Sequence, residues 1–443
     1  MSIERLGNDV RVRPAGKVAA CVELPGSKSL TNRYLTCAAL ADGDTTLTGA
    51  SLSDDTHQMI EALRSLGIRV ATDAHGPEIQ IGGCRGHLPA DTADLDLGLA
   101  GTAMRFVTAL TCLGYGRYRI DGAPRMRARP IGQLVGALNT LGAGIGYDDV
   151  SGFPPLTLVA RGLTGGQVVF DRPVSSQFVS ALLMIAPYAA TDVLVRVTGE
   201  LTSRPYVDMT TGVMRAMGVE TLASNGGRFI VPSTQRYRAG RFAIEPDASA
   251  ASYFWAAAAI TGGCVRVAGL SRASAQGDVA FVDVLERMGC EVEAGEDYLE
   301  IRGPEPGRLR GVAEDLNAMP DMVQTLAVTA LFAEGPTHVR NVANLRVKET
   351  DRIAALEREL TRLGARVDVH ADGLTVFPAK RITPAEIETY DDHRMAMSFA
   401  VAGLATEGVT IKNAGCVSKS FPEFFDVLAG LDPTGEARNP AAP

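Results

Sequence analysis

Short polar motifs in this sequence carry lysine, arginine and serine next to the predicted starts of helices. Lys28 and Ser29 lie in GSKS, and Arg394 lies in DDHR. Further cations cluster in PRMRARP (residues 124–130) and RVKETDR (residues 346–352). A helix N-terminus presents unpaired N–H groups and the positive end of the helix dipole, so it favours anions. The pattern therefore predicts that the protein binds small polyanions.

Carboxylates stand beside several of these cations. Glu349 lies between Lys348 and Arg352, Asp321 follows a proline at another predicted helix start, and a pair of aspartates precedes His393. Each acid could serve only as a helix cap, which is worth ~1 kcal/mol. An acid held among fixed cations is also a place where the pKa can be tuned for proton transfer. The residues alone leave both interpretations open.

Two landmarks repeat along the chain and indicate the elements that position these residues. A helix-stop pattern of Leu or Met, two residues, Leu or Met, and Gly ends at residues 67, 142, 218, 289 and 364, at intervals of 71 to 76 residues. Polar helix starts recur with nearly the same period in GSKS, GTAM, SSQF, DASA, PDMV and DDHR. Alternating runs after the stops, as in residues 290–303 and 365–377, predict hairpins. The chain is thus predicted to fold as six βαβαββ-like units of ~70 residues, packed three by three.

Composition excludes several classes of protein. The net charge of −8 argues against a nucleic-acid binder. Seven cysteines without a CxxC motif argue against a disulfide framework or a zinc site and fit a reducing cytoplasm. No apolar run reaches the ~20 residues of a membrane helix, and no signal peptide opens the chain. We expect a cytoplasmic protein with no metal, whose first eight residues and residues 433–443 are frayed.

Eight motifs together resemble the 5-enolpyruvylshikimate-3-phosphate synthase family. They are LPGSKSLTNR, GTAMR, PRMRARPIG, SSQF, SRPY, RVKETDR, DDHRMAM and KSFPEFF, in order across residues 24–425. The resemblance implies an α/β fold of two similar domains, each with three βαβαββ units around a pseudo-threefold axis (an inside-out α/β barrel), and an active site in the interdomain cleft. Residues 1–25 and 246–443 would form the C-terminal domain, on the phosphoenolpyruvate side. Residues 26–245 would form the N-terminal domain, on the shikimate 3-phosphate side.

The resemblance also implies a reaction. The family transfers the carboxyvinyl group of phosphoenolpyruvate to the 5-hydroxyl of shikimate 3-phosphate and releases phosphate, by addition and elimination through a tetrahedral intermediate. This is a step of chorismate and aromatic amino acid biosynthesis, and it needs no metal or organic cofactor. The expected partners are these two small molecules, with no nucleic acid and no membrane, and the expected state is a monomer.

Site residues follow position by position from the resemblance. The expected catalytic residues are Asp321, Glu349, Lys28 and His393, with Asp321 resembling the acid that hydrogen-bonds the attacking hydroxyl and Glu349 the group that protonates the methylene carbon. The residues expected to hold shikimate 3-phosphate are Lys28, Ser29, Arg33, Ser175, Ser176, Gln177, Ser203, Tyr206, Asp321, Asn344 and Lys348. Those expected to hold phosphoenolpyruvate are Lys28, Gly101, Arg125, Gln177, Arg352, Arg394 and Lys419.

Two positions depart from the family pattern. Leu99 stands where Asn is common, and Phe106 stands where many members have Pro. Both border the pocket expected for the herbicide glyphosate, which competes with phosphoenolpyruvate, so we expect altered sensitivity to it.

Three alternatives share the fold or the site chemistry. The enolpyruvyl transferase acting on UDP-N-acetylglucosamine usually carries a reactive Cys or Asp in the loop equivalent to residues 124–130, where this chain has neither. RNA 3′-phosphate cyclase would need a nucleotide, an RNA end and a catalytic His near the C-terminus, which the sequence does not favour. A non-catalytic phosphometabolite-binding relative would not need Lys28, Asp321, Glu349 and Lys419 together.

Overall fold

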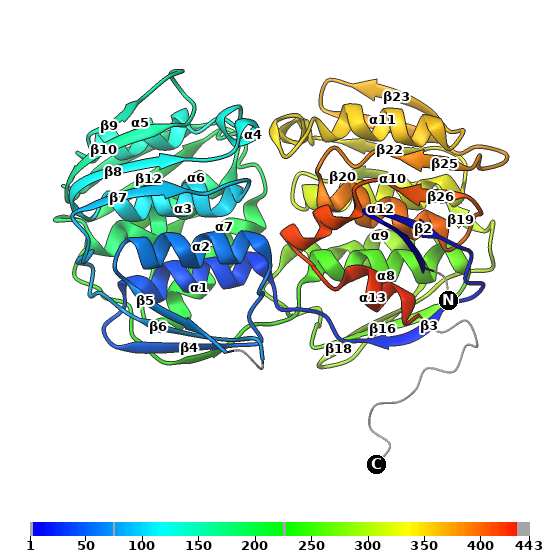
Figure 1. Cartoon of the computed structure of the whole chain (residues 1–443), viewed down its shortest axis with the longest axis horizontal. Helices are drawn as coiled ribbons and strands as arrows, with labels where there is room; N and C mark the ends of the chain where they lie inside the picture. Colours follow the sequence, from blue (N-terminus) through cyan, green and yellow to red (C-terminus); the bar gives the residue numbers. More distant parts are fainter. Residues whose placement is uncertain (1–2, 74–75, 225–226, 432–443) are drawn as a thin grey trace, which may run out of the picture. The chain divides into compact units, whose positions relative to one another are not determined.

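The computed structural model of the chain describes residues 3–73, 76–224 and 227–431 (Figure 1). The chain forms two compact units. Unit 1 comprises Met1–Pro25 and Pro246–Pro443, and unit 2 comprises Gly26–Glu245. Each unit has its own hydrophobic core of buried side chains. The predicted tail at residues 433–443 lies outside the described residues.

Unit 2 contains three four-stranded sheets with one common strand pattern. Their orders are β15-β4-β6-β5, β7-β8-β10-β9 and β11-β12-β14-β13, with the first pair parallel and the other two pairs antiparallel. The strands are β4 (Asp44–Thr48), β5 (Arg69–Thr72), β6 (Glu78–Gly82), β7 (Thr92–Asp96), β8 (Tyr115–Asp121), β9 (Ile145–Tyr147), β10 (Leu156–Arg161), β11 (Gly166–Asp171), β12 (Val193–Thr198), β13 (Leu222–Ser224), β14 (Arg228–Val231) and β15 (Arg241–Ala243). The helices are α1 (Lys28–Leu40), α2 (Asp54–Ser65), α3 (Gly101–Thr111), α4 (Pro124–Arg127), α5 (Gly132–Thr140), α6 (Ser176–Ile185), the 3₁₀ turn η1 (Ala186–Tyr188) and α7 (Arg204–Ala216).

Unit 1 repeats the same pattern in sheets β3-β16-β18-β17, β20-β22-β24-β23 and β25-β26-β2-β1. Its strands are β1 (Ile3–Leu6), β2 (Asp9–Val12), β3 (Ala19–Val22), β16 (Cys264–Ala268), β17 (Glu291–Ala294), β18 (Tyr298–Arg302), β20 (Ala313–Asp315), β22 (Thr337–Arg340), β23 (Arg366–His370), β24 (Gly373–Phe377), β25 (Ala385–Ile387) and β26 (Val409–Ile411), with a small extra pair β19 (Leu309–Arg310) and β21 (Ala333–Glu334). Its helical elements are α8 (Ala248–Thr261), η2 (Gly277–Ala280), α9 (Phe281–Arg287), η3 (Pro320–Met322), α10 (Val323–Thr329), η4 (Ala330–Phe332), η5 (Ala343–Val347), α11 (Arg352–Arg362), α12 (His393–Gly403), η6 (Ala414–Lys419) and α13 (Phe424–Ala429).

The predicted repeat is confirmed, because six four-stranded sheets among the described residues share this βαβαββ order. The predicted hairpins are also present, as β17–β18 and β23–β24. The pseudo-threefold arrangement implied by the resemblance stays a prediction.

The expectation that the first eight residues are frayed is wrong. Residues 3–6 form β1 and residues 9–12 form β2, and β2 pairs with β26 near the other end of the chain. Val10 and Val12 are buried on one face of β2, so this strand completes the sheet of the last repeat. The polar composition of this segment gave no sign of a strand, because the partner strand lies about four hundred residues away in the sequence.

Buried helices form the centre of each unit. All fourteen residues of α8 are buried, and α3 and α12 are buried along their whole lengths. A helix that is apolar or small on every face is typical of a core element. Each predicted polar start falls at the beginning of a helix or of the turn before it, so the polar first residues lie at the helix ends.

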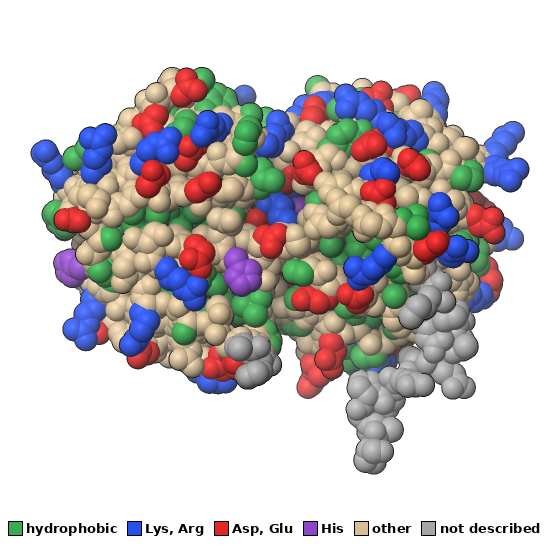
Figure 2. Space-filling view, in the orientation of Figure 1, with side chains coloured by type: hydrophobic (Ala, Val, Ile, Leu, Met, Phe, Trp, Pro, Cys, Tyr) green, Lys and Arg blue, Asp and Glu red, His purple; other side chains and the backbone are tan. Residues whose placement is uncertain are grey.

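The surface carries charges of both signs. Figure 2 shows acidic and basic side chains interspersed over the visible face of each unit. Among the described residues, no helix combines the length and the apolar composition that crossing a membrane requires.

Candidate active site

In unit 2, the N-terminal ends of four helices lie together. Ser175 caps α6, and Gln177 Nε2 donates to Thr102 Oγ1 (3.1 Å) in the first turn of α3. Arg33 of α1 donates to the carbonyl oxygen of Tyr206 (3.0 Å), in the first turn of α7. The positive end of each helix dipole lies at these ends, and together they make a region that favours anions.

Lys28 is the first residue of α1 and is held by a carboxylate. Its Nζ donates to Asp55 Oδ2 (2.8 Å), in the first turn of α2, and the two side chains are only 12% and 5% exposed. A charge-assisted hydrogen bond between largely buried groups fixes the direction of the ammonium group. Asp55 was not among the predicted site residues. The polar helix start SDDTH was the available signal, but its acids look like ordinary first-turn residues.

Arg33 is almost fully buried, at 1% exposed. Its guanidinium donates to Thr210 Oγ1 (2.7 Å) and to the carbonyl oxygen of Ser29 (2.8 Å), and it lies 5.5 Å from the centre of the Phe106 ring. Burial lowers the pKa of Arg33 to about 10, so the side chain stays charged at neutral pH. The structure therefore places this predicted ligand as a link between α1 and α7, with the unusual Phe106 packed beneath it.

The three arginines of the loop at residues 124–130 have different environments. Arg127 pairs with Asp121 through two hydrogen bonds (2.8 and 2.7 Å), and the predicted Arg125 is partly exposed. Arg129 is only 5% exposed and packs against the first residue of α3: a Cβ built on Gly101 would lie 2.5 Å from Arg129 Nη1. A side chain at position 101 would therefore require the Arg129 guanidinium to move away from this helix end.

Arg105 ties the same loop to α3. This buried side chain donates to the carbonyl oxygens of Pro130 (2.9 Å) and Gly101 (3.2 Å). Neither Arg105 nor Arg129 was among the predicted site residues. The sequence placed both in the relevant motifs, but spacing alone could not say which arginines turn toward the start of α3.

In unit 1, Arg352 is the centre of an ion-pair network. It is 1% exposed and donates to Asp392 (2.7 and 3.2 Å), Asp321 (3.1 Å) and Glu349 (2.9 Å). Asp392 also caps α12 by accepting from the backbone N–H of Arg394 (2.9 Å). Asp392, for which the sequence left a role as a helix cap only open, therefore does two things: it caps α12 and neutralises a buried arginine.

Arg394 extends this network to α8. Its Nη2 donates to Asp321 Oδ2 (2.8 Å) and to Ser249 Oγ (3.1 Å), and its Nη1 donates to Tyr253 Oη (3.3 Å). On the other side, Lys419 Nζ lies 4.0 Å from Glu349 Oε1. Glu349 thus stands between two cations, and Asp321 accepts hydrogen bonds from two arginines, Arg352 and Arg394.

The charges around Asp321 set its protonation state. Burial by itself would raise the pKa of Asp321, but the positive charges of Arg394, Lys348 and Arg352 outweigh it and lower the pKa well below its ordinary value. Asp321 is therefore ionised at neutral pH. Burial raises the pKa of the neighbouring Tyr253 to about 12, so this phenol stays protonated.

The other predicted residues lie close in sequence to these two sets. His393 is buried, and its Nδ1 lies 3.7 Å from Asp392 Oδ1. Asn344 belongs to η5, and Lys348 follows it. Ser203 immediately precedes α7 and has a left-handed backbone conformation (φ 58°), and Ser29 and Ser176 lie in the first turns of α1 and α6.

Comparison with known proteins decides the family. The sequence model of the family described as EPSP synthase (3-phosphoshikimate 1-carboxyvinyltransferase) matches residues 12–428. The chain belongs to the EPSP synthase family. A 3-phosphoshikimate 1-carboxyvinyltransferase of Trichormus variabilis is 50% identical over 408 residues, covering 92% of this chain and 95% of that one. One of Vibrio atlanticus is 47% identical over 422 residues, covering 95% and 98%.

The fold agrees with a solved EPSP synthase. The structure of the Acinetobacter baumannii enzyme matches with a TM-score of 0.79 at 25% identity, covering 96% of this chain and 98% of that one. The resemblance stated from the eight motifs is therefore confirmed. The individual site residues of this EPSP synthase family member remain predictions, to which the geometry adds Asp55, Arg105, Arg129 and Asp392.

Proposed function

We propose that this chain transfers the carboxyvinyl group of phosphoenolpyruvate to the 5-hydroxyl of shikimate 3-phosphate. A proton adds to the methylene carbon of phosphoenolpyruvate, and the hydroxyl oxygen bonds to the neighbouring carbon. The hydroxyl proton leaves. Loss of phosphate and of one methyl proton then restores the double bond. The observation that carries the proposal is the pairing of Glu349 and Asp321 with Arg352, Arg394 and Lys419, since two acids among cations suit proton transfer beside phosphorylated anions.

We assign the two acids different roles. Glu349 touches Arg352 and approaches Lys419, and it is the proposed donor to the methylene carbon. Asp321 is ionised, so it is the proposed acceptor of a hydrogen bond from the attacking hydroxyl. A substrate phosphate that binds among the same arginines would compete with Asp321 for them. The pKa of Asp321 would then rise, which would make Asp321 a better base.

The substrates themselves are part of the proposal. The buried cations Arg129, Arg352, Arg394 and Lys419 suit the phosphate and carboxylate of phosphoenolpyruvate. The serines and backbone groups at the starts of α1, α6 and α7 suit the phosphate of shikimate 3-phosphate. The absence of a cysteine or an acid from residues 124–130 does not favour the UDP-N-acetylglucosamine alternative. The cytoplasmic location, the monomeric state and the active site shared by the two domains stay predictions.

A two-substrate assay tests the proposed function. Phosphate release is measured with both substrates, with each substrate alone, and with UDP-N-acetylglucosamine in place of shikimate 3-phosphate. We expect release only when shikimate 3-phosphate and phosphoenolpyruvate are both present, with one enol ether formed per phosphate. Release with the nucleotide sugar, or with phosphoenolpyruvate alone, would contradict the proposal.

The arginine loop gives a paired prediction. Arg129→Ala is expected to raise the KM for phosphoenolpyruvate at least tenfold, because it removes a buried cation from the start of α3. Arg125→Ala is expected to change it less, because Arg125 is partly exposed. Steady-state kinetics of both variants decide between the two arginines. A larger increase in Arg125→Ala than in Arg129→Ala would assign phosphoenolpyruvate binding to Arg125.

The Leu99 departure predicts a change in inhibition. Leu99→Asn restores the amide that is common in the family at this position, two residues before Gly101. We expect the inhibition constant for glyphosate to change severalfold, measured against phosphoenolpyruvate as the varied substrate. An unchanged constant would remove Leu99 from any account of herbicide sensitivity.

A further inference from the structure

Two consecutive residues before α12 have left-handed backbones. Tyr390 has φ 54° and Asp391 has φ 55°, and neither is glycine. Side chains with a Cβ rarely adopt this conformation, and bulky ones such as Tyr do so at a cost that surrounding contacts must offset. The next three residues are Asp392, His393 and Arg394, so the strained turn sets the start of the helix that carries the site.

Tyr390 is fixed from the side of α11. Its hydroxyl donates to Glu359 Oε1 (2.6 Å), and Glu359 is fully buried in α11. The second oxygen of Glu359 accepts from the backbone N–H of Glu388 (3.2 Å). The turn is therefore anchored to the helix whose first residue is Arg352.

Asp391 is fixed from the other side by Asn413. Asn413 Nδ2 donates to Asp391 Oδ1, and Asn413 Oδ1 accepts from Asn8 Nδ2 (2.8 Å). The backbone N–H of Asn413 donates to Asp9 Oδ1 (2.9 Å), and Lys412 pairs with the same carboxylate. Asn413 is itself left-handed, with φ 47°.

These contacts join two segments of the site. Asn413 immediately precedes η6, the turn that ends at Lys419, while Asp391 immediately precedes the residues that include Arg394. The turn between β1 and β2, which carries Asn8, holds the junction in place. A shift of Asn413 would therefore move Lys419 and Arg394 relative to each other.

We infer that Asn413 and Asp391 are positioning residues, which form a clamp that sets the spacing of Lys419 and Arg394. The inference rests on the proposed function, because both cations are assigned there to phosphoenolpyruvate. The clamp touches neither cation directly and acts through the starts of η6 and α12. It predicts a defect in phosphoenolpyruvate binding that does not extend to shikimate 3-phosphate bound by the serines of unit 2.

The test uses variants that separate side-chain bonds from backbone strain. Asn413→Ala removes both side-chain bonds and disfavours the left-handed backbone, whereas Asn413→Gly removes the bonds but permits that backbone. Asn413→Asp sets two carboxylates against each other. Adding Asp391→Asn to Asn413→Asp restores one donor and one acceptor in reversed order. Arg85→Ala is the matched control, because Arg85 is also left-handed (φ 55°) and hydrogen-bonds Asp42, but it lies outside the proposed site.

We expect Asn413→Ala and Asn413→Gly to raise the KM for phosphoenolpyruvate about equally, at least fivefold, with the KM for shikimate 3-phosphate within twofold of the wild type. Asn413→Asp should raise the KM for phosphoenolpyruvate further. The double variant Asn413→Asp with Asp391→Asn should return this KM to within threefold of the wild-type value. Arg85→Ala should leave both constants unchanged. Calorimetric titration of phosphoenolpyruvate in the presence of shikimate 3-phosphate should give the same order of affinities. Thermal melting confirms that each variant is folded.

Recovery of normal kinetics in Asn413→Gly would overturn the clamp, since the backbone alone would then suffice. Equal loss of both substrates, or no rescue by the reversed pair, would overturn it as well. If the wild type turns over and every Asn413 variant has the same kinetic constants, the clamp is rejected and the proposed function stands. A wild type that neither turns over nor binds phosphoenolpyruvate would reject both.

Discussion

Glu349→Gln is expected to lower kcat by about 10²–10⁴-fold, with the KM values of both substrates changed much less. Glutamine keeps the length of the side chain and can still accept a hydrogen bond from Arg352, so the network should survive. It cannot deliver a proton to the methylene carbon. Because that proton transfer belongs to the transition state, its loss should appear in kcat. Steady-state kinetics with both substrates measure the effect.

The matched control for this variant is Glu357→Gln, an exposed glutamate on the neighbouring helix α11. It removes the same charge from the same unit at a distance from the network, so its kcat should equal that of the wild type. A near-normal rate in Glu349→Gln would remove Glu349 from the chemistry. A large rise in KM at constant kcat would make it a binding residue only.

Arg352→Met is expected to lower the free energy of unfolding by about 3–5 kcal/mol and to abolish turnover. The buried guanidinium bonds Asp392, Asp321 and Glu349, and methionine would leave all three carboxylates without this partner. Arg352 is one of the three cations that lower the pKa of Asp321, so without it this pKa moves back up toward its ordinary value. A carboxylate whose folded-state pKa is depressed loses its stabilising contribution as the pH falls, so the variant should lose less stability than the wild type as the pH falls through the ordinary carboxylate range. Urea unfolding at several pH values measures both effects.

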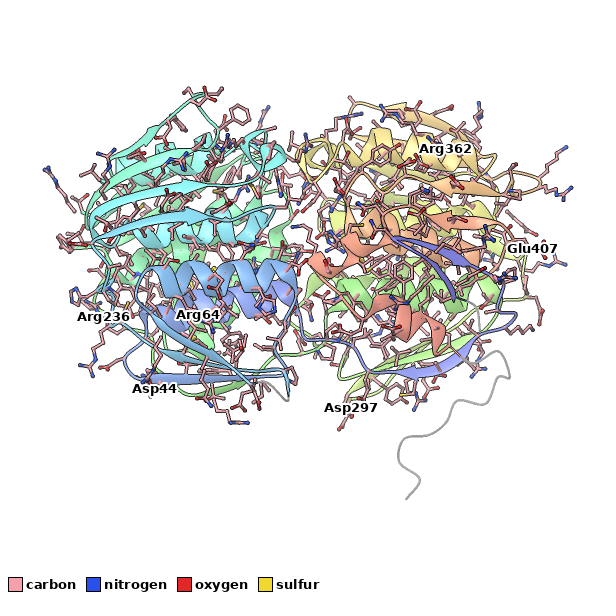
Figure 3. The ribbon with its side chains drawn as sticks, viewed as in Figure 1. Asp44, Arg64, Arg236, Asp297, Arg362 and Glu407 are labelled. Carbon is pink, nitrogen blue, oxygen red and sulfur yellow. The ribbon has the colours of Figure 1, made fainter. Side chains whose placement is uncertain are left out.

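Arg362→Met is the control at the other end of the same helix. Arg362 is exposed (Figure 3) and pairs at 3.5 Å with Glu359, which would keep its hydrogen bonds from Tyr390 and from the backbone N–H of Glu388, so the loss of Arg362 should cost at most ~1 kcal/mol. Arg352→Lys should fall between the two, because a single ammonium cannot reproduce the fork that reaches three acids. A loss below ~1 kcal/mol in Arg352→Met would show that the network contributes little to stability.

Local signals predicted the repeat and the helix starts. A glycine after a helix and a polar residue before one affect only the few residues nearest the helix end. GTAM and DDHR could therefore be assigned to helix ends without knowledge of the fold. The family resemblance then supplied the acids Asp321 and Glu349. The helix starts and the two acids could be predicted because each lies in a short motif of consecutive residues.

Contacts between different helices and strands could not be predicted from these local signals. Arg352 meets Asp392, which is forty residues away, and Lys28 meets Asp55 from the next helix. Whether Arg125 or Arg129 is buried at the start of α3 depends on the path of the chain after α4. The sequence shows only that arginines recur every two residues in this loop. The strand at residues 3–6 was missed for the same reason, because its sheet is completed by β26 from the far end of the chain.

The central claim is that this chain breaks the carbon–oxygen bond of phosphoenolpyruvate while acids among fixed cations move the protons. Phosphoenolpyruvate labelled with ¹⁸O in the bridging position tests it most directly, with mass spectrometry of the phosphate released in the presence of shikimate 3-phosphate. We predict that the label appears in phosphate and that the enol ether of the product carries the unlabelled oxygen of the 5-hydroxyl. Label retained in pyruvate or in the organic product would mean phosphorus–oxygen cleavage and would contradict the account.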